Sequence, residues 1–233
     1  MGDKSKIAMK PDLSTKRPPN WLLRTRNALI VLLVLIALVV AGRRLMSLTG
    51  MIKTYVNPKF GEFDGGFRLH PFLTFLHIIP GILFMVLTPL QFVSRIRERH
   101  IRVHRVSGWV IATAASIIGC TALVMSFTLP IGGATETAAT AVFALFFLFS
   151  LYKAIYHIRK KEVRLHREWM IRMFSIGLAI ATVRPIVGMF FAFSKLSPHQ
   201  FFGIAFWLGF TIHLIAAECW IRCYRQDRAK NIV

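Results

Sequence analysis

Residues 71–93 read PFLTFLHIIPGILFMVLTPLQFV and contain no lysine, arginine, aspartate or glutamate. An α-helix rises about 1.5 Å per residue, so about 20 predominantly apolar residues are enough to cross the hydrocarbon core of a bilayer. This stretch meets both requirements, of length and of composition. It therefore predicts a membrane-spanning helix, and with it an integral membrane protein.

Five further stretches have the same character, and together the six predict an all-α integral membrane bundle of about six transmembrane helices. The chain has 233 residues, of which 55% are hydrophobic, a composition typical of the integral membrane class. Arg43 and Arg44 interrupt the first stretch, so they either end it or lie within a span and extend their charged ends toward water. The predicted spans are 27–49, 71–93, 107–130, 138–157, 171–193 and 201–222.

Lysine and arginine are unevenly distributed between the connections. Of the 30 in the chain, 22 lie in the two terminal segments and in the connections near 94–106 and 158–172, and only six lie in the alternate connections. Because cytoplasmic loops are enriched in these residues, the bias predicts that both termini are cytoplasmic in a multi-pass protein of the cell membrane. The predicted organisation is a basic cytoplasmic tail at 1–26, a first helix and outer loop at 27–70, a five-helix membrane core at 71–222 and a second basic cytoplasmic tail at 223–233.

The formal net charge of +20 would favour nucleic acid as a partner if the protein were soluble. Here the positive charge is confined to short segments between apolar runs, so membrane topology and contact with anionic lipid headgroups explain it more simply. We expect the lipid bilayer as the partner and no nucleic acid. The sequence leaves the oligomeric state open.

Two polar residues are predicted to share one layer in the outer half of the membrane. His77 lies six residues into its span, about 9 Å deep, and Arg184 lies nine residues before the end of its span, about 13 Å deep. An arginine at membrane depth costs about 2.5–3.5 kcal/mol on insertion scales, so it needs acceptors or water. Neutral His77 is one such acceptor, and Pro185 frees a backbone carbonyl as another. The alternative is that Arg184 only braces the bundle.

A second polar layer is predicted at the cytoplasmic ends of the spans. It centres on twin motifs, RVHR at 102–105 and RLHR at 164–167, each followed by a tryptophan. Most of the arginines fit a basic rim that fixes topology. Histidine is usually neutral at pH 7, so topology explains the two histidines less well. The candidate site residues of this layer are Gln91, His104, Arg105, His166, Arg167, Trp169, Arg172 and Glu218.

Several of these residues belong to short motifs that are specific in combination: HIIPG at 77–81, PLQF at 89–92, HRVSG at 104–108 and HREWMIR at 166–172, together with Arg184 and Glu218. In them the chain resembles DUF2306, a family of bacterial polytopic membrane proteins, from about His77 to Glu218. The resemblance implies a several-helix domain in a bacterial inner membrane and brings no established activity with it. His213 departs from the family pattern, which often has asparagine there, so the role of His213 is left open.

Three functions fit these observations. The first is a small transporter or channel for an anion or protons, with a polar path between the His77–Arg184 layer and the histidine layer. The second is a membrane redox protein that binds b-type haem between His104 and His166; no other metal ligand set is predicted. The third is a structural or assembly subunit. An enzyme or binding protein acting on a lipid phosphate is less favoured, because no paired-carboxylate, DxxD or nucleophile motif is present.

Overall fold

The computed structural model describes residues 20–51 and 66–230, and these residues form α-helices and no strand. Six of the helices are long and apolar enough to cross a membrane, which confirms the predicted fold class. A short helix, α4 (Ser94–Arg99), connects α3 to α5. The six long helices are α1 (Asn20–Leu48), α3 (Pro71–Gln91), α5 (Ile101–Thr128), α6 (Gly133–Arg159), α7 (Val163–Phe193) and α8 (Pro198–Lys230).

The helices extend beyond the apolar runs from which they were predicted. Arg43 and Arg44 do not end α1, which continues for another turn to Leu48. α6 and α7 begin several residues before the predicted spans, and so Glu136 and Glu168 lie within helices. Polar residues at helix ends can stay helical because their side chains reach water or a partner. The boundary of an apolar run therefore underestimates the length of the helix. Residues 1–19, 52–65 and 231–233 lie outside the described residues. They include most of the first predicted tail and of the outer loop, and the end of the second predicted tail.

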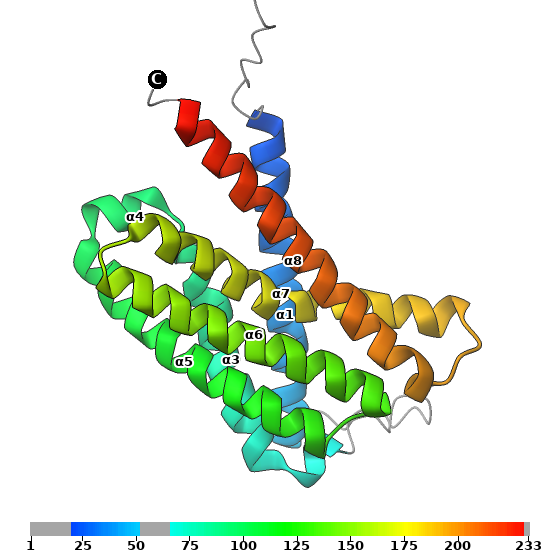
Figure 1. The fold of residues 1–233 in the computed structure, drawn as a ribbon. Coiled ribbons are helices and arrows are strands. Elements are labelled where there is room, and N and C mark those ends of the chain that lie inside the picture. The colour runs from blue at the N-terminus through cyan, green and yellow to red at the C-terminus, as the bar shows by residue number, and fades with distance from the viewer. Residues whose placement is uncertain (1–19, 52–65, 231–233) are drawn as a thin grey trace, which may run out of the picture.

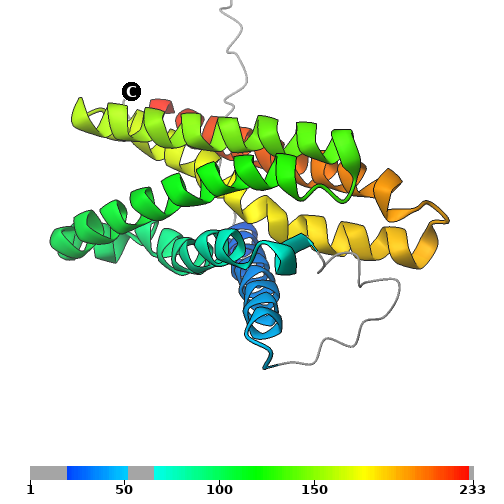
Figure 2. The same cartoon turned by 90° about the horizontal axis from the view of Figure 1, so that it is seen from below.

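Consecutive helices of the core lie side by side (Figure 1). α5, α6, α7 and α8 pack in order, α3 packs against α5, and α6 also contacts α8. Short connections between long helices make neighbours antiparallel. α1 is different, because it crosses the bundle at a steep angle and packs against α3 and α7 (Figure 2). Only 6% of its apolar span is buried inside the protein.

Because neighbouring helices run in opposite directions, the connections between them gather at two ends of the bundle, and these ends differ in composition. We call one of them the basic end; it holds 91–105, 157–172 and 218–225. The start of α1 also reaches α8 near this end, where the Arg26 guanidinium lies 4.0 Å above the Trp220 ring. The opposite end holds the start of α3, the turn between α5 and α6, and the connection from α7 to α8.

Bulky apolar side chains fill the space between the helices. Phe84, Ile111 and Met173 are each at most 1% exposed and belong to one core cluster. Other large apolar residues, such as Leu145 and Ile215, are more than half exposed. All six long helices have exposed apolar surface. Such surface is suited to contact with lipid tails, because the hydrocarbon core of a bilayer contains no water. The fold is thus a helical bundle whose outer surface suits a bilayer.

Candidate functional site

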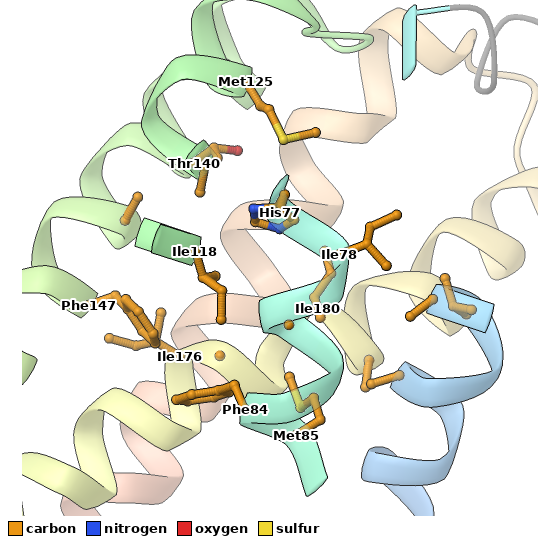
Figure 3. A pocket seen from close by; sticks show the side chains of 18 of the residues that line it. His77, Ile78, Phe84, Met85, Ile118, Met125, Thr140, Phe147, Ile176 and Ile180 are labelled. Atoms are coloured by element: carbon orange, nitrogen blue, oxygen red, sulfur yellow. The ribbon is translucent and has the colours of Figure 1, made fainter. Parts of the chain in front are cut away.

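A cavity of about 270 Å³ lies between the six long helices, in the half of the bundle near the opposite end. All six contribute to its lining, together with Phe67. Figure 3 shows it extending from Met125 and Thr140 past His77 and Ile118 toward Phe84. Its polar lining residues are Arg44, His77, Ser126, Glu136, Thr140 and Arg184. We refer to Arg44 and Arg184 as the cavity arginines.

His77 and Arg184 line this cavity together, from α3 and α7, which is the shared layer that their depths predicted. The predicted contact between them is not what holds His77. Its Nδ1 lies 2.9 Å from the Thr121 hydroxyl, and that hydroxyl donates its only proton to the carbonyl of Ile117 at 2.7 Å. Nδ1 therefore carries a proton and donates it to Thr121, which leaves Nε2 as an acceptor. Pro185 has no N–H, so the carbonyl of Ala181, also in the lining, lacks its usual helical donor.

Glu136 is a cavity residue that sequence reasoning missed. It lies in the first turn of α6, and one carboxylate oxygen accepts the backbone N–H of Ile131 at 2.7 Å and of Gly132 at 2.5 Å. The carboxylate thus satisfies two N–H groups at the start of a helix, where negative charge is favoured. Glu136 is buried and lies within electrostatic range of Arg184. The sequence signal that could have found it is a glutamate placed a few residues after the Gly132–Gly133 turn, where its side chain can reach back to the N–H groups at the start of a helix.

The turn that carries Glu136 is held against α8 by a close approach of backbones. A Cβ added to Gly132 would lie 2.8 Å from the Gly203 nitrogen, and one added to Gly203 would lie 2.9 Å from the Glu136 nitrogen. Gly133 has φ +63, a left-handed conformation that glycine adopts at no steric cost. Glycines at these positions let α6 and α8 meet tightly enough to fix Glu136 at the cavity.

Arg44 is the second cavity residue that was not predicted as a site residue. It is 8% exposed, and its guanidinium lies 4.0 Å from the centre of the Phe67 ring, a cation–π distance. Its neighbour Arg43 is exposed and is absent from the cavity lining. The sequence signal was the uneven first span, in which an arginine pair interrupts an apolar run without ending the helix.

The floor of the cavity is aromatic. Phe84 is 1% exposed and makes an edge contact with Phe147 at 5.6 Å between ring centres, and a tilted contact with Phe174 at 6.2 Å. Gly177 makes room for Phe84, since a Cβ there would lie 2.7 Å from its ring. These apolar rings lie on the side of the cavity that is nearer to the basic end.

At the basic end, the two motif histidines are near neighbours. His166 lies within electrostatic range of His104, and also of His157. The His166 Nδ1 donates to the Ala154 carbonyl at 2.9 Å, which leaves Nε2 without its proton and available to a ligand. The Nδ1 atom of His104 is buried and has no hydrogen-bond partner among the described residues. The structure thus brings together the histidines that the twin motifs singled out.

The other predicted residues of this layer bond elsewhere. Gln91 donates to the Ser107 hydroxyl at 2.6 Å, one turn beyond His104. Trp169 lies edge-on to Phe149 and beneath the Arg172 guanidinium, 4.5 Å from its carbon. Glu218 is accompanied by further acids within the long helices, Glu136 in α6 and Glu168 in α7. In addition, Arg105 is exposed and Arg167 is partly buried.

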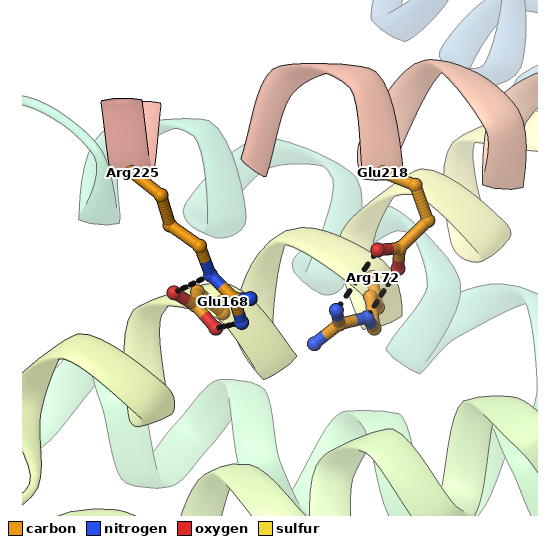
Figure 4. A network of polar contacts seen from close by, with 4 residues as sticks. All are labelled: Glu168, Arg172, Glu218 and Arg225. Carbon is orange, nitrogen blue, oxygen red and sulfur yellow. Dashed lines mark hydrogen bonds and ion pairs between the residues drawn. The ribbon is translucent and has the colours of Figure 1, made fainter. Parts of the chain in front are cut away.

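α7 and α8 are joined at this end by two arginine–glutamate pairs, which we call the crossed pairs because each helix contributes one acid and one base (Figure 4). Arg172 donates to both oxygens of Glu218, at 2.5 and 3.0 Å. Arg225 donates to both oxygens of Glu168, with its Nε at 2.8 Å. Glu168 is only 3% exposed while Arg225 is 49% exposed, and this hydrogen bonding raises the pKa of Arg225. Bidentate pairs of this kind fix geometry as well as charge.

His213, whose role the sequence left open, is partly buried and has a local partner. Its Nε2 lies 2.7 Å from the hydroxyl of Thr182 on α7. It does not appear in the cavity lining. A hydrogen bond between α7 and α8 accounts for a partly buried histidine at this depth.

The family model described as "predicted membrane protein (DUF2306)" matches residues 74–221. The match covers more than half of the chain, so the protein belongs to this family, and it confirms the resemblance seen in the sequence motifs. Comparison with curated proteins and with solved structures finds no match. The protein is therefore a member of a polytopic membrane family, and its activity has to be inferred from the site itself.

Proposed function

We propose that the protein is a small transporter that binds an anion in the cavity between its six long helices. The observation that carries the proposal is that the two cavity arginines come from α1 and α7, far apart in the sequence, and line one space. Guanidinium groups within apolar helices are costly and mark ligand or ion paths by default. Arginine is also the side chain best suited to bind an oxyanion through two parallel hydrogen bonds, in a bidentate pair.

The shape of the cavity favours a transporter over an open channel. Its floor is closed by Phe84 and Phe147, and beyond the floor lies the second polar layer around His104 and His166. A binding site near one side, a closed floor and polar groups beyond it are the parts that alternating access requires. A proton-conducting path is less favoured because apolar rings interrupt it.

We further infer that the protein lies in a bacterial inner membrane with both termini in the cytoplasm. The support is the excess of lysine and arginine at the basic end, which orients the cytoplasmic side. In this orientation the exposed arginines of that end, such as Arg105, lie at the level of anionic lipid headgroups. The cavity would then lie in the outer half of the bilayer.

The test is anion binding and flux with the purified protein. In nanodiscs, we expect binding of methanesulfonate or octanesulfonate by calorimetry, and Arg184→Gln should lower the affinity roughly tenfold to a hundredfold, because a hydrogen bond to a charged group contributes about 1.5–3 kcal/mol. In proteoliposomes, uptake of the same anion should fall in parallel.

Lys153→Gln is the matched control, since Lys153 is a cation of α6 that lies near the Phe149 and Tyr156 rings and away from the cavity. Equal affinities of the two variants, or no binding of either anion by the unchanged protein, would refute the anion site. Binding without flux would refute transport and leave a binding protein.

A second candidate is a b-type haem protein, and the observation that favours it is the hydrogen bond from His166 to Ala154, which leaves Nε2 free to bind iron. The visible spectrum decides this directly. A Soret band that is lost in both His104→Ala and His166→Ala would support haem between them. A protein expressed with ample haem and showing no Soret band is not a haem protein.

A further inference from the structure

We propose that the anion bound in the cavity carries an apolar tail, with its charged head at the cavity arginines and its tail extending toward Phe84. This inference rests on the proposed anion site and adds the class of its ligand. It comes from the division of the cavity lining into two parts of different chemistry.

The polar part of the cavity lies toward the opposite end of the bundle and the apolar part lies deeper. Along α3 the lining runs from His77 to Met85, and along α7 it runs from Arg184 to Ile176. In each stretch the two ends are eight positions apart, which at about 1.5 Å per residue is roughly 12 Å of depth. The two helices thus independently describe a site with one polar part and one deeper, apolar part.

The deeper part offers no charged group among its lining residues. It is formed by side chains such as Phe84, Met85, Ile118, Phe147 and Ile176, and Figure 3 shows these surrounding the lower part of the space. A small hydrated anion would contact only the mouth and leave this surface unused. An alkyl tail would instead bury apolar area there, and each buried methylene contributes about 0.8 kcal/mol, a roughly fourfold gain in affinity.

The backbone of α3 leaves room for such a tail. Gly81 lines the cavity one turn deeper than His77, and a Cβ added to it meets no atom within 4 Å. By contrast, a Cβ at Gly177, on the opposite wall, would meet Phe84 at 2.7 Å. There is therefore open space beside Gly81, between the polar part of the cavity and the aromatic floor.

The first experiment is a homologous series of alkylsulfonates, which keep one negative charge at any working pH. Methanesulfonate, butanesulfonate and octanesulfonate are titrated into the protein in nanodiscs of neutral phosphatidylcholine, with protein-free nanodiscs to subtract partitioning into lipid. We expect affinity to rise roughly fourfold per methylene that enters the apolar part. Equal affinity for all three anions would overturn the proposal while leaving the anion site in place.

The second experiment fills the space beside Gly81. Gly81→Leu should lower the affinity for octanesulfonate much more than the affinity for methanesulfonate. The matched control is Gly188→Leu on α7, where an added Cβ also meets nothing within 4 Å and the residue is exposed and outside the cavity lining. If Gly81→Leu and Gly188→Leu bind octanesulfonate alike, the tail does not lie beside Gly81 and the proposal is wrong.

An anion with an apolar tail has two sources, the bilayer itself and a dissolved solute. Repeating the titration in nanodiscs that contain phosphatidylglycerol separates them. Weaker octanesulfonate binding there, with the weakening abolished by Gly81→Leu, supports the proposal and identifies a lipid as the occupant. Undiminished chain-length dependence supports it with a solute as the occupant. Absence of binding for every anion in the unchanged protein would count against the anion site rather than against the tail.

Discussion

At the basic end of the bundle, acids and arginines of α7 and α8 bind one another in the crossed pairs. In the other half, the cavity arginines and the carboxylate of Glu136 line a cavity whose deeper part is apolar. Ion pairs that are closed on themselves hold helices in register. Charges that line a cavity can instead bind something that enters it. The same residue types therefore have different roles in the two regions, and substitutions in each region can test this difference.

The largest effect on stability is expected from Arg225→Gln. It leaves the carboxylate of Glu168, which is 3% exposed, without its bidentate partner, and an uncompensated buried charge is strongly destabilising. Because Arg225 itself is half exposed, we expect a loss of about 2–3 kcal/mol in the free energy of unfolding, measured by circular dichroism during titration with denaturing detergent.

The double variant Glu168→Gln with Arg225→Gln should recover part of this loss, since no buried charge then remains. Arg222→Gln is the control, because Arg222 is an exposed arginine of the same helix. A loss in Arg222→Gln as large as that in Arg225→Gln would show that the crossed pair is not what joins α7 to α8. Neither variant should change anion binding at the distant cavity.

Gly203→Ala is expected to destabilise the protein by about 2 kcal/mol, through overpacking. The added Cβ would lie 2.1 Å from the Thr135 hydroxyl and 2.9 Å from the Glu136 nitrogen, so the turn that fixes Glu136 has to move. Unlike the change at Arg225, this one should also weaken anion binding. Gly42→Ala, whose Cβ meets nothing within 4 Å, should leave unfolding and binding as they are. An unaltered affinity in Gly203→Ala would mean that Glu136 does not shape the cavity.

Arg44→Gln should reduce octanesulfonate affinity roughly tenfold, the lower range for removing a charged hydrogen-bond donor. Arg44 adds charge at the cavity mouth, and part of its guanidinium already stacks on Phe67. The adjacent Arg43 is exposed and outside the lining, so Arg43→Gln changes the net charge of the protein equally without changing the site. If calorimetry gives the two variants the same affinity, the effect of Arg44 is one of overall charge alone.

The helices and the depths of polar residues could be predicted from the sequence because hydropathy and helical rise determine both. His77 and Arg184 were assigned to one layer from residue counts alone, and they do line one cavity. Glu136 was missed because it lies just outside an apolar run, and a hydropathy boundary assigns such a residue to a loop even when the helix continues through it. Arg44 was missed for another reason, because an arginine pair within the first stretch fits either a helix end or side chains that extend toward water.

Side-chain pairing could not be predicted in the same way, because it depends on how the helices are rotated against each other. Glu218 was placed near the histidines by depth, but it bonds to Arg172. Glu168 lies within the HREWMIR motif, which was interpreted as part of a basic rim. It is in fact buried and paired with Arg225, 57 positions later in the chain. The depth of a residue follows from its position along one helix, whereas its side-chain partner depends on how two helices are oriented relative to each other.

The smallest predicted effect compares two histidine–threonine hydrogen bonds, one at the cavity and one away from it. Thr121→Val removes the partner of His77, and Thr182→Val removes that of His213. Each loses a neutral hydrogen bond, so each should cost about 1 kcal/mol in the free energy of unfolding. Only Thr121→Val should change octanesulfonate affinity, by a few-fold, because the freed His77 ring can then turn within the cavity. Equal affinities of the two variants would mean that the orientation of His77 has no bearing on the ligand. A change in Thr182→Val alone would move the site toward His213 and contradict the assignment made here.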